Sequence, residues 1–108
     1  MTLSEAKAKY VFTTRIELDD CEFIVMREPN LSEYQKFSAT DDTKNLEQIK
    51  LIFPKCIVES SFTDENGNQA SGQQIYEMLS QSATSFTGIM EKWLTSCPFQ
   101  SHGKKNKN

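Results

Sequence analysis

The loop sequence FTDENGNQA holds the residues whose types and spacing come nearest to a metal site. Asp64, Asn66 and Asn68 alternate as in the first half of a calcium-binding loop, where side-chain oxygens at alternating positions surround the ion. Such a loop also needs Gly at its sixth position and a carboxylate at its twelfth. These positions hold Gln69 and Ile75. The pattern therefore predicts a polar turn, with a bend at Asn66-Gly67, and no metal or cofactor is expected.

The only histidine, His102, lies in the polar segment SHGKKNKN. A Ser–His or Cys–His catalytic pair needs a histidine that is held within hydrogen-bond reach of the nucleophile, and a polar tail is a poor place for one. The sequence has no Gly-rich phosphate-binding loop. Four acidic residues fall in predicted turns, where Asp serves to bond the backbone: Asp19, Asp20, Asp41 and Asp42. We therefore predict no catalytic residue and no enzyme activity.

The chain has three cysteines, Cys21, Cys56 and Cys97, far apart and without a CxxC pair. An odd number at these spacings is unlike a disulfide framework or a zinc site. The pattern indicates a reducing compartment and ordinary buried thiols.

Charge gives little reason to expect a nucleic acid or a membrane as partner. Lys104, Lys105 and Lys107 have no aromatic residues between them, so they would attract nucleic acid only weakly and at low salt. The net charge of the chain is −3, too small to draw it to either surface. A solvated tail is the better interpretation.

Length and composition indicate one small domain. A chain of 108 residues can bury a modest core without disulfides or metals. The opening MTLSEAKAKY has no apolar run, so no signal peptide is expected, and no segment reaches the length of a membrane span. We predict a cytoplasmic protein with a flexible segment at 1–9, a single α+β domain at 10–98 and a disordered polar tail at 99–108.

Alternating apolar residues on both sides of Asp19-Asp20 predict a β-hairpin that begins near Tyr10 and ends before Pro29. A two-residue turn at Asp19-Asp20 puts three pairs on one face: Leu18 with Cys21, Ile16 with Phe23, and Thr14 with Val25. An isolated hairpin is only marginally stable, so this face must pack on helices or on a partner's strand.

The sequence pattern of the middle of the chain, from about Leu31 to Ile52, predicts mostly helix. Asn30 and Glu33 have the spacing of a capping box, which predicts a helix from about Leu31 to Ser38. After a polar break at 39–42, a second helix is predicted from Thr43 to about Ile52, with Leu46, Ile49 and Phe53 on one side; Phe53-Pro54 argues against its continuation. The apolar run 55–58 fits either a last helical turn or a strand, and its period cannot decide.

The strongest pattern is the helical period of the segment Ser71–Leu94. Ser71 and Gln74 fit a capping box at its start, and Pro98 follows its end. One face of this helix is apolar, with Ser82 as its only polar interruption: Ile75, Leu79, Phe86, Ile89, Met90 and Trp93. We assign Ile75, Leu79 and Phe86 to the core of the domain.

The late part of this stripe is also a candidate surface for a partner. The stripe is widened by Leu94 on one flank and by Met78 on the other, so a small domain need not cover all of it. Met and Trp are favoured at adaptable binding surfaces. We predict that Met90, Trp93 and Leu94 bind a partner protein, with burial in the chain's own core as the default alternative.

The layout resembles a family. A hairpin leads into an Arg-Pro segment (MREPNLSEYQKF), a helix leads into an apolar run with a cysteine (LEQIKLIFPKCIVESSF), and a D-x-x-G loop (DENG) precedes a final helix with a Trp (IYEMLSQSATSFTGIMEKWL). This layout, from about Ile16 to Pro98, is similar to the small tail assembly chaperones of long-tailed bacteriophages and prophages. The first ten residues, the lysine-rich tail and Phe53-Pro54 depart from that family's pattern.

The resemblance implies a protein without catalytic residues. Chaperones of this family bind the tape-measure protein and keep it soluble while tail-tube subunits polymerise around it. The alternatives are a host-encoded adaptor or secretion chaperone of the same layout, and, in a different class, a small enzyme or a nucleic-acid-binding regulator. Self-association into a homo-oligomer is left open.

Overall fold

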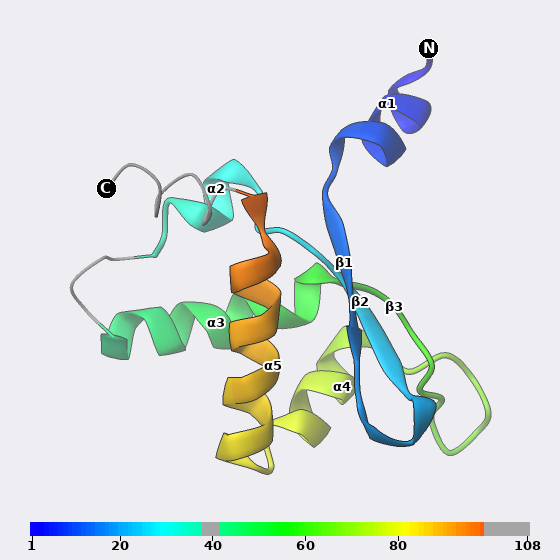
Figure 1. Cartoon of the computed structure of the whole chain (residues 1–108), viewed down its shortest axis with the longest axis vertical. Helices are drawn as coiled ribbons and strands as arrows, with labels where there is room; N and C mark the ends of the chain where they lie inside the picture. Colours follow the sequence, from blue (N-terminus) through cyan, green and yellow to red (C-terminus); the bar gives the residue numbers. More distant parts are fainter. Residues whose placement is uncertain (38–41, 99–108) are drawn as a thin grey trace.

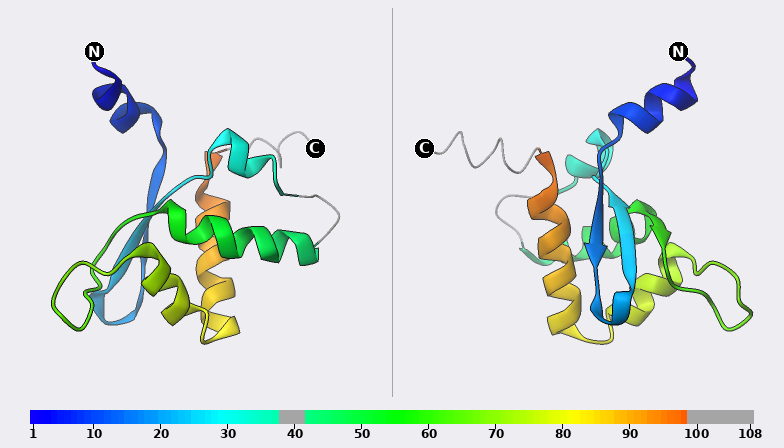
Figure 2. Two further views of the ribbon diagram at one scale, coloured as in Figure 1. Left: turned by 180° about the vertical axis from the view of Figure 1, so that it is seen from behind. Right: turned by 45° about the vertical axis from the view of Figure 1, so that its right-hand side comes forward.

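The structure is a computed structural model that describes residues 1–37 and 42–98. An antiparallel sheet in the order β1-β2-β3 lies on one side, and α3, α4 and α5 lie on the other (Figures 1 and 2). This arrangement confirms the predicted α+β class. In chain order the elements are α1 (Leu3–Tyr10), β1 (Thr13–Glu17), a 3-10 turn (Asp19–Cys21), β2 (Phe23–Arg27), α2 (Leu31–Tyr34), α3 (Asp42–Cys56), β3 (Ile57–Ser60), α4 (Gly72–Leu79) and α5 (Ala83–Ser96).

The N-terminal segment is helical. Thr2 caps α1 in a capping box with Glu5, and no residue of α1 is buried. The helix projects away from the rest of the molecule, with Leu3 and Tyr10 exposed (Figure 1). The first strand therefore begins at Thr13 and not near Tyr10 as predicted, because Tyr10 belongs to α1.

The predicted hairpin forms, but its register is shifted by one residue. The turn holds three residues rather than two, with Asp20 at φ 60° and Cys21 at φ 65°, and Ile16 pairs with Ile24 instead of Phe23. Because side chains alternate along a strand, this shift turns β2 over. Ile24 and Met26 face the core at 0% exposure, while Phe23 lies on the opposite face under the guanidinium of Arg15.

Helix α3 runs through Pro54, against the prediction that it would end near Ile52. Pro54 removes one backbone donor in the last turn, and the burial of Phe53 and Cys56 beside it offsets that loss. The ambiguous run 55–58 is resolved as both options, since α3 ends at Cys56 and β3 begins at Ile57. The capping box at Asn30 and Glu33 is confirmed, although α2 ends at Tyr34. The predicted break falls largely on 38–41, and the predicted tail on 99–108, outside the described residues.

The predicted single helix from Ser71 to Leu94 is two helices. The capping box of Ser71 and Gln74 is confirmed at the start of α4, but the chain turns after Leu79, and Ser82 caps α5 by accepting a hydrogen bond from Ser85 N at 3.3 Å. The one polar interruption of the stripe is thus a helix cap. The turn lets both apolar faces pack on α3, where Phe53 contacts Tyr76, Phe86 and Trp93 at ring-centroid distances of 6.0, 5.0 and 5.4 Å.

The core lies between the sheet and these helices. Ile75 and Leu79 are buried, as predicted, while Phe86 is half-buried at its margin. The buried apolar side chains come from both layers: Ile16, Ile24, Met26, Ile49, Ile52, Phe53, Cys56, Ile75, Leu79, Ile89, Trp93 and Cys97. Leu46, predicted to lie on the same side of its helix as Ile49 and Phe53, is 59% exposed, while Ile49 and Phe53 are buried. None of the helices in the described part of the chain has the length and apolar character that a membrane crossing requires.

Two glycines on the helices test this packing with opposite expected signs. A Cβ at Gly72 would lie 2.1 Å from the carbonyl oxygen of Pro54, whereas a Cβ at Gly88 would meet nothing within 4 Å. Gly72→Ala must therefore push α4 away from α3 and is expected to destabilise the fold by about 1–3 kcal/mol. Gly88→Ala is expected to stabilise it by about 0.5–1 kcal/mol through helix propensity alone. Urea denaturation of both variants checks this, and a stable Gly72→Ala variant would contradict the α3–α4 contact.

Candidate functional site

The structure corrects one of the three predicted partner-binding residues. Trp93 is 0% exposed, and its indole N–H donates to the carbonyl oxygen of Arg27 at 2.9 Å. Trp93 therefore belongs to the core, and a partner could reach it only if the domain opened. Met90 and Leu94 are half-buried and pack against the same core. The end of the stripe is thus mostly buried in the chain's own core, which is the alternative that the sequence analysis gave as the default.

The carbonyl that accepts from Trp93 belongs to a polar network at the end of β2. Arg27 donates two hydrogen bonds to the carboxylate of Glu33, at 2.7 and 3.1 Å, and Glu33 also accepts from Asn30 N at 2.9 Å. The hydrogen bond from Arg27 holds the pKa of Glu33 below its ordinary value of 4.5, and burial opposes this effect. The same hydrogen bond raises the pKa of Arg27. The network fastens α2 and α5 to β2. Among the described residues no buried side-chain nitrogen or oxygen lacks a hydrogen-bond partner, which indicates a structural role for the network.

The two buried thiols are unsuited to nucleophilic chemistry. Burial raises the pKa of Cys56 to about 12 and the pKa of Cys97 to about 11, so both are protonated near neutral pH. Cys97 donates to the carbonyl oxygen of Trp93 at 3.3 Å. Cys21, predicted to be buried, is exposed in the hairpin turn.

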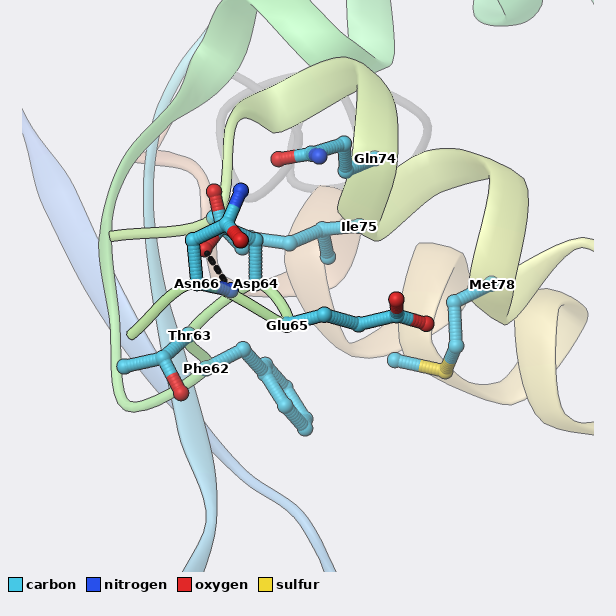
Figure 3. A pocket seen from close by; sticks show the side chains of 9 residues that line it. Phe62, Thr63, Asp64, Glu65, Asn66, Gln74, Ile75 and Met78 are labelled. Atoms are coloured by element: carbon cyan, nitrogen blue, oxygen red, sulfur yellow. Dashed lines mark hydrogen bonds between the residues drawn. The ribbon is translucent and has the colours of Figure 1, made fainter. Parts of the chain in front are cut away.

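A pocket of about 390 Å³ lies between the 62–70 loop and α4 (Figure 3). Its apolar lining comes from Phe62, Ala70, Ile75 and Met78. Ile75 is almost fully buried and connects the pocket to the core, while Met78 is 45% exposed at the mouth. The volume falls in the range of sites that hold one or a few side chains or a small ligand.

Hydrogen bonds fix the shape of the loop. Asp64 Oδ1 accepts from Asn66 N at 2.9 Å and from Asn68 N at 3.0 Å. Gly67 completes the turn at φ +83°, which an L side chain rarely adopts. Gln69 Nε2 donates to the carbonyl oxygen of Ser60 at 3.0 Å and so ties the loop to β3. One wall of the pocket is therefore formed before anything binds, which lowers the entropic cost of binding.

The rim of the pocket is acidic. Glu65 is exposed, and its side chain extends from the loop toward Met78 across the mouth (Figure 3). Its carboxylate forms no ion pair with any described residue, unlike the second carboxylate, Asp64, which bonds the loop backbone. An apolar floor with a carboxylate at its edge suits an apolar side chain that has a Lys or Arg close by.

The sequence predicted the polar loop and the place of Met78 on its helix, but it did not predict that the two form a pocket. The loop was predicted as a polar turn at Asn66-Gly67, which is confirmed by the Thr63–Gln69 bridge and by the bond from Gly67 N to Asp64 O. Met78 was placed on a flank of the apolar stripe, and its exposure follows from that place. Within 1–37 and 42–98, no three His, Cys, Asp or Glu side chains gather where they could hold a metal ion. His102 and the three tail lysines lie outside the described residues.

Comparison with known proteins adds no relative. No protein-family model, no curated protein and no solved structure matches the chain.

Proposed function

We propose that this chain is a non-enzymatic, cytoplasmic chaperone of phage tail assembly that holds an apolar segment of a tape-measure protein and keeps it soluble. The observation that carries the proposal is the pre-formed pocket with Met78 exposed at its mouth. A flexible thioether can adapt to different apolar side chains, as a chaperone for a long, varied helix requires. The resemblance of the layout to tail assembly chaperones supplies the identity of the partner.

Met78 takes the place of Trp93 in this proposal. A helix of the partner would insert one apolar side chain above Phe62 and Ile75, while a basic side chain one turn away would approach Glu65. Met90 and Leu94 remain candidates for a second contact, since both are partly exposed. Of the three thiols, Cys56 and Cys97 are buried and protonated near neutral pH, so neither is available as a nucleophile in the folded domain.

Co-expression tests the proposal directly. A tape-measure protein, taken from the gene neighbourhood of this chain if tail genes are found there, would be produced with wild type, with Met78→Asp, or with Leu51→Asp. Leu51 is a matched control because it is an apolar side chain, 60% exposed, on α3 outside the pocket. Wild type and Leu51→Asp should keep the partner soluble and co-purify with it, while Met78→Asp should lower the recovered complex by about tenfold.

Two outcomes contradict the proposal. If wild type leaves the tape-measure protein insoluble, the chaperone function is wrong. If Met78→Asp, with an unchanged melting temperature, recovers as much complex as wild type, the pocket is not the binding surface. A gene neighbourhood without any tail genes would favour the host-encoded adaptor, which could use the same pocket.

A further inference from the structure

Strand β1 is an edge strand of the sheet. The order β1-β2-β3 leaves one side of β1 without a neighbouring strand, and α5, which contacts β1, runs beside it on that side (Figure 2, right). Leu18 N donates to Glu22 O at 2.8 Å and Glu28 N donates to Phe12 O at 3.1 Å. These bonds show that the even-numbered residues of β1 turn their backbone toward β2. The N–H and C=O groups of Thr13, Arg15 and Glu17 therefore point outward, and no described segment pairs with them.

The charges on this edge are complementary to those on the same edge of a second, antiparallel copy. Arg15 and Glu17 are exposed, lie on the outer face of the sheet and flank Ile16. If two copies of β1 met antiparallel about a two-fold axis at Ile16, each Arg15 would stand opposite Glu17 of the other copy. These two residues would also form the hydrogen-bonded pairs of the new ladder, because their backbone groups point outward. A shift of the axis to Arg15 would put the two guanidinium groups opposite each other.

We propose that the chain forms a two-fold symmetric dimer by antiparallel pairing of β1 with β1 of a second copy, centred on Ile16. The contact is isologous, as a two-fold interface must be. It joins the two sheets into one and removes an exposed edge from each copy. The guanidinium of Arg15, already held 3.8 Å from the centre of the Phe23 ring, needs to exchange Glu17 of its own chain, at 2.8 Å, for Glu17 of its partner.

Charge-reversal variants distinguish the Arg15–Glu17 pairs between two copies from the Arg15–Glu17 pair within one chain. Arg15→Glu and Glu17→Arg should each weaken the dimer at least about tenfold, because each places like charges opposite each other twice. When the two variants are mixed in equal amounts, every cross-strand pair is again Glu opposite Arg. The mixture should therefore recover a heterodimer, although each variant alone has like charges at positions 15 and 17 within its own chain.

The measurement is sedimentation equilibrium of wild type, both variants and their mixture from micromolar to millimolar concentration, at low salt. Wild type and the mixture are expected at the dimer mass, twice that of the 12.4-kDa chain. Each variant alone is expected at or near the mass of one chain. Glu59→Arg on β3, at the opposite edge, is the matched control and should dimerise like wild type. Far-UV circular dichroism and the melting temperature confirm that each variant is folded.

Three results would overturn the proposal. These are a wild type that is monomeric at every concentration, a mixture that stays monomeric, and a Glu59→Arg variant that is weakened as much as Arg15→Glu. The first would mean that the charges of β1 protect the edge from pairing. None of the three bears on the pocket, whose test uses Met78.

Discussion

Replacing Trp93 by Ala is expected to lower the free energy of unfolding by about 3–5 kcal/mol, the range for a large side chain removed from a packed core. Trp93 is 0% exposed and packs edge-on against Phe53 at 5.4 Å between ring centroids. The substitution also leaves the carbonyl of Arg27 without its indole donor. Chemical denaturation with urea, followed by circular dichroism, measures the change.

Trp93→Phe separates packing from hydrogen bonding. It keeps most of the aromatic contact with Phe53 and removes only the N–H donor to Arg27, so we expect a loss of about 1–3 kcal/mol. An unchanged stability in Trp93→Ala would place Trp93 on the surface. Such a result would restore the partner-binding role that the sequence predicted for it.

Replacing Glu33 by Gln is expected to cost roughly 3 kcal/mol, because it leaves the guanidinium of Arg27, only 20% exposed, without its opposite charge. Glu33→Gln keeps the size of the side chain and one carbonyl acceptor, so the loss reports on the charge rather than on packing. Glu17→Gln, measured at concentrations at which the chain is monomeric so that the proposed dimer does not contribute, is the matched control. Its pair with Arg15 is more than half exposed, so the change should be within about 1 kcal/mol.

The pH dependence of stability follows from the same pair. The pKa of Glu33 is lower in the folded chain than its ordinary value of 4.5, so the unfolded chain binds the proton more readily. The contribution of Glu33 is therefore complete above pH 4.5 and is lost as the pH falls through the lower, folded-state pKa. Wild type should lose stability in this acid range, and Glu33→Gln should lose less. Equal acid limbs for both proteins would contradict the assignment.

Local signals in the sequence were sufficient for several features of the fold. The capping boxes at Asn30 and Ser71 formed where they were predicted, because each depends on side chains three residues apart. The turn at Asn66-Gly67 formed because Gly67 takes a left-handed conformation at little cost. The apolar period of α4 identified Ile75 and Leu79 as core residues.

Features that depend on contacts between elements were missed. Asp19-Asp20 gave no reason to expect that Cys21 would join the turn and shift β2 by one residue. The apolar stripe from Ile75 to Trp93 has a single polar interruption, and it therefore concealed the turn that folds α5 back onto α3, although that interruption, Ser82, lies at the turn. The pocket was missed for the same reason, since Phe62 and Met78 lie 16 positions apart and meet only in the folded chain.

The most direct test of binding through the pocket is a titration of the protein with its methionine methyl groups carbon-13 labelled, using an apolar helical segment of the tape-measure protein. Met78 lines the pocket, Met90 lies on α5 and Met26 is buried in the core, so the four methionines report on different regions. We predict a large shift of the Met78 methyl signal, with the Met26 signal unchanged. A shift of Met90 with Met78 unaffected would contradict the pocket and return the binding surface to the end of α5.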